Sequence, residues 1–99
     1  MPTYKIKSEV WLYPSATAAW HFVSLSKKQS EEIDKKFGDK RHGWNSFPVS
    51  VMLGKTKWNT SIFFDKREQA YILPLKADVR KREGVRQGDV IVFTLEVLS

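Results

Sequence analysis

A chain of 99 residues with 41% hydrophobic residues, including four Trp, is long enough to pack one core and too short for a second. The absence of cysteine excludes disulfides, thiolate nucleophiles and the usual zinc and iron–sulfur ligand sets. A formal net charge of +6, from 17 Lys and Arg against 11 Asp and Glu, favours an anionic partner, although such a surplus also serves ordinary solubility.

The segment that opens the sequence has no pattern typical of targeting or membrane insertion. Met1 to Lys5 begins a polar strand pattern instead of a charged region followed by an apolar one. No apolar run approaches the roughly 18 residues that span a bilayer. We therefore expect a cytoplasmic protein with no membrane partner, folded as a single domain over residues 1–99.

The first part of the chain is expected to form two strands and a helix. Apolar residues alternate with polar ones from Tyr4 to Leu12, and an aromatic, β-branched stretch follows from Trp20 to Leu25. Between Ser26 and Gln29 the sequence has the form of a capping box, in which each side chain bonds the other residue's backbone N–H. A helix should begin there and end at Gly38, since glycine favours helix C-termini.

A hairpin is expected in the middle of the chain. Residues 39–45 are polar and are predicted to form a loop. Alternating apolar residues then occupy 47–53, where Pro48 indicates an edge strand or a strand start because proline cannot donate to the ladder. Gly54-Lys55 has the form of a two-residue turn with glycine first, after which the chain returns as a strand over 56–64.

The last part repeats the pattern of strand, helix and strand. Residues 69–73 form a strand that Pro74 ends, and proline is tolerated in the first turn of the helix that follows. That helix is predicted over 76–83 and is stopped by Gly84. The final strand presents one buried face, made of Ile91, Phe93, Leu95 and Val97.

The order of elements therefore occurs twice, over roughly residues 20–53 and 69–98. In this comparison Leu25-Ser26-Lys27 corresponds to Leu73-Pro74-Leu75. Two interlocking halves would hide the sheet edges that an open set of strands exposes. We predict a mainly β fold, a barrel of about six strands with two short helices, built by internal duplication.

Four motifs in order carry a resemblance to a known family: Trp-His-Phe-Val-Ser-Leu from Trp20, Gly-Trp-Asn-Ser-Phe-Pro-Val from Gly43, Trp-Asn-Thr-Ser-Ile-Phe from Trp58, and Tyr-Ile-Leu-Pro-Leu-Lys from Tyr71 with Val79-Arg80. From about Tyr4 to Val97 the chain resembles the bacterial DUF1905 family of domains of unknown function. The second half also resembles the swapped-hairpin motif of AbrB- and MazE-type proteins, regulators and antitoxins that build a double-split β-barrel from two chains. The resemblance implies a single-chain double-split β-barrel and implies no activity.

Catalysis and metal binding find little support in the sequence. The histidines, His21 and His42, belong to no Ser/His/Asp signature, and no Gly-x-Ser-x-Gly motif is present. The densest carboxylates, Glu31, Glu32 and Asp34, are expected on the solvent face of one helix instead of in a cleft. No spacing is typical of a metal site or of a glycine-rich phosphate loop. We therefore predict no enzyme activity, no metal and no cofactor.

A basic group on the second helix is the first candidate site. Lys76 and Arg80 share a helix face because they are four residues apart, and Arg82 lies close by. An arginine can hold two oxygens of a phosphate or carboxylate at once, and the family resemblance includes Arg80. The simpler interpretation is that these cations are solvated and pair with Asp78 or Glu83.

Aromatic residues form the second candidate site. Trp44, Trp58 and Tyr71 belong to the matched motifs, and near Lys76 or Arg80 they would stack a planar ligand or a base. The simpler interpretation is that they fill the core, since short strands need large side chains to do so.

The leading hypothesis for function is a small non-enzymatic binding module, whose unknown ligand is small and anionic or planar. The alternative is a DNA- or RNA-binding transcriptional regulator of AbrB-like type. It is not favoured, because a fused chain loses the two-fold symmetry that palindromic operators match. A barrel closed within one chain predicts a monomer.

Overall fold

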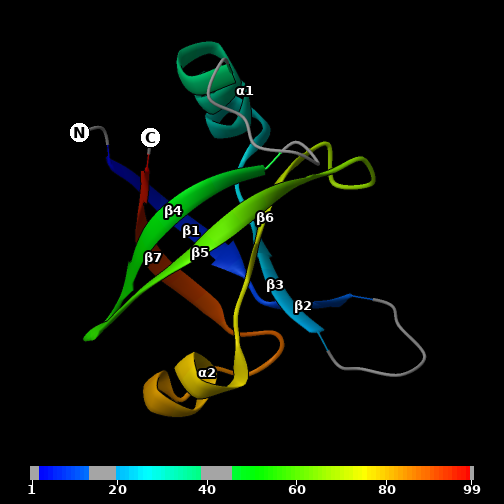
Figure 1. The fold of residues 1–99 in the computed structure, drawn as a ribbon. Coiled ribbons are helices and arrows are strands. Elements are labelled where there is room, and N and C mark those ends of the chain that lie inside the picture. The colour runs from blue at the N-terminus through cyan, green and yellow to red at the C-terminus, as the bar shows by residue number, and fades with distance from the viewer. Residues whose placement is uncertain (1–2, 14–19, 39–45, 99) are drawn as a thin grey trace.

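Seven antiparallel strands form one curled sheet with two short helices at opposite ends, in a computed structural model that describes residues 3–13, 20–38 and 46–98 (Figure 1). In chain order the elements are β1 (Thr3–Glu9), β2 (Trp11–Tyr13), β3 (Trp20–Ser24), α1 (Lys27–Phe37), β4 (Ser46–Leu53), β5 (Thr56–Asp65), β6 (Ala70–Pro74), α2 (Ala77–Glu83) and β7 (Val90–Val97). The strand order across the sheet is β1-β7-β4-β5-β6-β3-β2.

The strand predicted from Tyr4 to Leu12 is divided at Val10, so the described residues contain seven strands where about six were expected. Val10 is fully buried. Its N–H donates to the Asp89 carbonyl at 2.9 Å, and its own carbonyl accepts from the Gly88 N–H at 2.8 Å. These two bonds attach Val10 to the turn that precedes β7, and the chain changes its pairing partner there. Before Val10, β1 pairs with β7, and after it, β2 pairs with β3. The two edge strands of the sheet are therefore consecutive in the chain.

Strands β3 and β6 pair with each other, and each is followed directly by a helix that starts at the corresponding position of its strand. Val23 lies opposite Leu73. The Leu25 N–H donates to the Tyr71 carbonyl, and the Leu75 N–H donates to the His21 carbonyl, both at 2.9 Å. Leu25 immediately precedes the N-cap of α1, and Leu75 immediately precedes the N-cap of α2. The two leucines are thus the matching positions, which shifts the predicted correspondence of Leu25 with Leu73 by two residues.

The ends of the helices follow the predicted capping chemistry in most respects. Ser26 caps α1, and the capping box with Gln29 is present, as predicted. Gly84 ends α2 with φ 65°, a left-handed conformation that glycine adopts without strain. Gly38 also follows its helix, but in the right-handed conformation. The buried side of α1 is made of Ser30, Ile33 and Phe37.

The hairpin between β4 and β5 forms as predicted. Leu53 pairs with Thr56, and Gly54 has φ 58°, which a two-residue turn with glycine first requires. Of the two predicted positions for Pro48, a strand start or an edge strand, the first is correct, because it lies near the start of β4. It is not on an edge strand, because β4 lies between β7 and β5. Every residue of the predicted buried face of β7 lies in the hydrophobic core.

Candidate binding groove

An open groove of about 400 Å³ lies at the α2 end of the sheet. Strand β5 pairs with β6 only from Phe63 to Asp65, so the two strands separate before Phe63 and leave a gap in the ladder. The groove is lined by residues from both sides of this gap, from β3 and from the start of α2: Trp20, His21, Trp58, Asn59, Thr60, Pro74, Leu75, Lys76 and Arg80. The separation of β5 from β6 therefore positions the groove.

Two cations border the groove, and none of its lining residues carries a carboxylate. The Arg80 Nε donates to the Leu75 carbonyl at 3.0 Å, which holds the guanidinium against the first turn of α2. Its two terminal amino groups have no partner among the described residues, and neither does the Lys76 ammonium. The groove therefore offers unpaired donors to an anion, with one arginine already oriented.

Two tryptophans line the groove beside Pro74 and Leu75, and they differ in how far they are exposed. Trp58 is 8% exposed and belongs to the core. Trp20, the first residue of β3, is 56% exposed. An indole this exposed beside a groove offers an apolar ring to a ligand, whereas the Trp58 ring is almost entirely covered by the protein.

The structure brings together three of the six residues that the sequence proposed as a site: Lys76, Arg80 and Trp58. Arg82 is on the same helix but outside the groove lining, where it pairs with Asp78 at 3.3 Å. Trp44 lies outside the described residues.

Tyr71 lies away from the groove and packs in the core. Its ring meets those of Phe47 and Phe64 edge-on, with centroids 5.5 Å apart in each case. Its hydroxyl donates to Asp34, so this carboxylate is partly buried and not on the solvent face of α1 that the sequence predicted. Tyr71 is therefore a core residue, as the simpler interpretation of the sequence had it, because both its ring and its hydroxyl contact other parts of the protein.

Trp20, His21, Asn59 and Thr60 line the groove but were not among the predicted site residues. All four lie inside the sequence motifs that carry the family resemblance, so these motifs contain the segments that form the groove. The missing information was the separation of β5 from β6, which depends on tertiary pairing.

The remaining electrostatic features lie elsewhere. Partial burial, and then the Glu32 carboxylate, raise the pKa of the Tyr4 hydroxyl above its ordinary value of 10.0. Within the described segments, no three His, Cys, Asp or Glu side chains gather in a way that would hold a metal ion. No helix there is long and apolar enough to cross a membrane.

The strand order, the two short helices and the groove together define a small, mainly β protein with a curled antiparallel sheet. A model of the DUF1905 family, a domain of unknown function, matches residues 7–95, and the chain belongs to that family. The resemblance to DUF1905 seen in the sequence motifs is thereby confirmed. A comparison with curated proteins finds no match.

Proposed function

We propose that this protein is a non-enzymatic binding module whose groove takes a small, planar anion. One observation carries the proposal: Arg80 and Lys76, with no described carboxylate partner, border the same groove as the exposed indole of Trp20. A cation held beside an open aromatic face suits a ligand that combines a ring with a negative group.

The groove supplies a contact for each part of such a ligand. Its volume of about 400 Å³ lies within the range of small-molecule sites. The ring would lie against Trp20, and the anionic group would accept from the terminal amino groups of Arg80. Asn59 and Thr60 supply polar groups from the stretch of β5 that has no β6 strand beside it. Ligand orientation would therefore be fixed by charge at one end and by stacking at the other.

We further infer that the curled sheet is a single-chain double-split β-barrel made by duplication of residues about 20–53 and 69–98. The reciprocal bonds between β3 and β6 support this, as does the pairing of β4 with β7, since each pair joins corresponding strands of the two halves. A barrel closed within one chain would be a monomer. Light scattering that gave twice the mass of one chain would contradict this.

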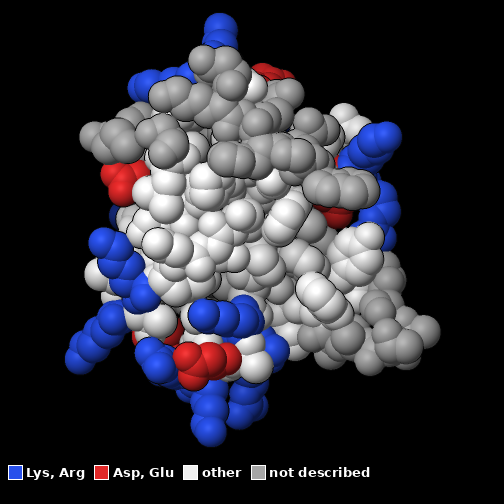
Figure 2. Space-filling view, viewed as in Figure 1, with Lys and Arg blue, Asp and Glu red and all other residues white. Residues whose placement is uncertain are grey.

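The alternative function, a DNA- or RNA-binding regulator of AbrB-like type, has one observation in its favour. The α2 end of the molecule is rich in lysine and arginine, and Figure 2 shows blue side chains gathered there. A duplex-binding regulator would bind labelled double-stranded DNA with an affinity that falls steeply as salt rises. Failure to bind duplex at low salt would exclude a regulator that acts on double-stranded DNA.

Thermal denaturation with added ligands tests the proposed function. Aromatic carboxylates and nucleoside monophosphates should raise the melting temperature, and neutral compounds with the same rings should not. A ligand at about 100 times its Kd adds about 2.7 kcal/mol to the free energy of unfolding. Arg80→Ala should abolish the shift, and Arg82→Ala is the matched control, because it removes an arginine of the same helix outside the groove. Equal loss in both variants, or equal binding of neutral compounds, would contradict the proposal.

A further inference from the structure

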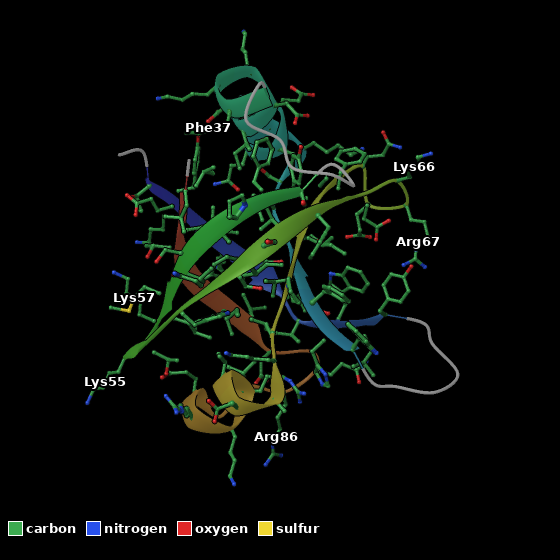
Figure 3. All side chains as sticks on the ribbon, viewed as in Figure 1. Phe37, Lys55, Lys57, Lys66, Arg67 and Arg86 are labelled. Carbon is green, nitrogen blue, oxygen red and sulfur yellow. The ribbon has the colours of Figure 1, made fainter. Side chains whose placement is uncertain are left out.

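The positive charge of the protein is concentrated at the α2 end. The β4–β5 turn with the start of β5 (residues 54–60) and the segment around α2 (residues 76–89) together hold seven Lys and Arg against three Asp and Glu. Helix α1, by contrast, holds four Lys against three acidic residues. Figure 3 shows Lys55 and Lys57 on the hairpin and Arg86 beside α2. We call these two segments the basic surface.

The three acidic residues of the basic surface are all engaged by the protein. Glu83 accepts from the Thr56 hydroxyl at 2.6 Å, and Asp89 accepts from the Arg86 backbone N–H at 2.8 Å. Asp78 pairs with Arg82 at 3.3 Å. By comparison, the cations of this surface other than Arg82 have no ion-pair partner among the described residues: Lys55, Lys57, Lys76, Arg80, Lys81 and Arg86. The basic surface therefore has a net positive charge, and all of these cations except the partly buried Arg80 are exposed.

The groove opens within this surface, because Lys76 and Arg80 belong to both. We propose that the partner is a single-stranded nucleic acid, with one base stacked on Trp20 in the groove and neighbouring phosphates on the basic surface. This inference rests on the proposed function, since it assigns a planar anion of a particular class to the same groove.

Single strands fit these features better than a duplex does. A base can stack on an aromatic side chain only when it is released from its own stack, and single strands present unstacked bases at little cost. A duplex encloses the faces of its bases, so it could use the basic surface but not the groove. The half-exposed Trp20 therefore distinguishes the two partners.

Fluorescence anisotropy with the full chain tests the inference, using labelled oligothymidylate and oligouridylate of about eight residues and a duplex of equal length. We expect both single strands to bind at least about tenfold more tightly than the duplex, and more tightly than the corresponding mononucleotides. A clear preference for one sugar would decide between DNA and RNA as the natural partner, and either result supports the inference.

Three variants separate the contribution of base stacking from that of the phosphate contacts. Trp20→Ala removes an exposed ring and should weaken single-strand binding about tenfold without changing the salt dependence. The double variant Lys81→Ala and Arg86→Ala should flatten the salt dependence, since each lost phosphate contact reduces the slope by about 0.7 for single strands. Lys35→Ala with Lys36→Ala on α1 is the control of equal charge change and should leave binding nearly unchanged.

Duplex binding equal to that of single strands would overturn the inference, as would an unaltered affinity of Trp20→Ala or an equal loss in the α1 control. If small planar anions bind through Arg80 but oligonucleotides bind no better than mononucleotides, this inference fails and the proposed function stands. If neither kind of ligand binds, both fail.

Discussion

The hydroxyl of Thr56 donates to the carboxylate of Glu83 at 2.6 Å, and this bond joins the β4–β5 hairpin to the last residue of α2. This bond holds together the two segments that form the basic surface. Its acceptor, Glu83, is one of the three acidic residues of that surface, so the same carboxylate affects both the stability of the protein and the charge of the surface.

We expect Thr56→Val to lower the free energy of unfolding by about 1.5 kcal/mol, because a partly buried bond to a charged group is lost at nearly constant side-chain volume. Equilibrium denaturation in urea measures this. Asp78→Asn is the control, since it removes a pair in which both side chains are more than half exposed and should change stability little. A larger effect at Asp78 than at Thr56 would contradict the assignment.

Gly54 should be coupled to the same bond. An alanine Cβ at Gly54 would lie 1.9 Å from the Glu83 carboxylate, so the carboxylate would have to move away from Thr56. Gly84 has a similar positive φ with nothing within 4 Å, so Gly84→Ala measures the backbone strain alone, about 1 kcal/mol. Gly54→Ala should destabilise by more than Gly84→Ala, and the excess should shrink when Thr56→Val is already present. Full additivity of Gly54→Ala and Thr56→Val would refute the coupling.

Ser30 is predicted to be a key polar residue of the core. It is 2% exposed, donates to the Ser26 carbonyl at 2.9 Å and accepts from the Tyr71 N–H at 3.0 Å. Ser30→Ala removes the hydroxyl that accepts from the Tyr71 N–H, and we expect the free energy of unfolding to fall by about 1–3 kcal/mol. Amide hydrogen exchange at Tyr71 should also accelerate. Unchanged exchange at that amide would show that the bond is not formed in solution.

The two groove tryptophans should respond differently to truncation. Trp58→Ala removes a buried ring and should destabilise the protein by about 3–5 kcal/mol. Trp20→Ala removes an exposed ring and should change the unfolding free energy by less than about 0.5 kcal/mol while weakening the binding of planar ligands about tenfold. Thermal denaturation with and without ligand measures both effects. Strong destabilisation by Trp20→Ala would place this ring in the core and not in the site.

The free energy of unfolding should depend on pH through the hydroxyl of Tyr4. Its hydroxyl has a raised pKa in the folded protein, so the neutral form is favoured by folding. This contribution is fully present below the ordinary pKa of 10.0 and is lost as the pH rises through the folded value. Tyr4→Phe should therefore lose less stability than the original protein above pH 10.0. Ultraviolet titration of the phenolate should show the corresponding late transition, and its absence in the original protein would contradict the shift.

Local chemistry predicted much of the secondary structure. The capping box at Ser26, the glycine-first turn at Gly54 and the helix stop at Gly84 each depend on a few neighbouring residues, and each is present. The bend at Val10 could not be predicted in this way, because it follows from bonds to Gly88 and Asp89 at the far end of the sequence.

The candidate site was predictable only in part for the same reason. Lys76 and Arg80 were paired by helical spacing, which is local, and both line the groove. Trp20 was missed, because its place beside them depends on the antiparallel pairing of β3 with β6. The sequence proposes Tyr71 because it is aromatic and belongs to a matched motif, but its side chain points to Asp34 of α1 and not into the groove.

The reciprocal bonds that join Leu25 to Tyr71 and Leu75 to His21 limit how this chain can evolve in length. Both helices start directly after this one pair of strands, and the groove lies at its end. A single inserted or deleted residue between Phe22 and Leu25, or between Ile72 and Leu75, would shift the register, turn the following side chains to the opposite face and rotate a helix with them. Insertions and deletions should therefore be tolerated only outside this strand pair, however freely its individual side chains are exchanged.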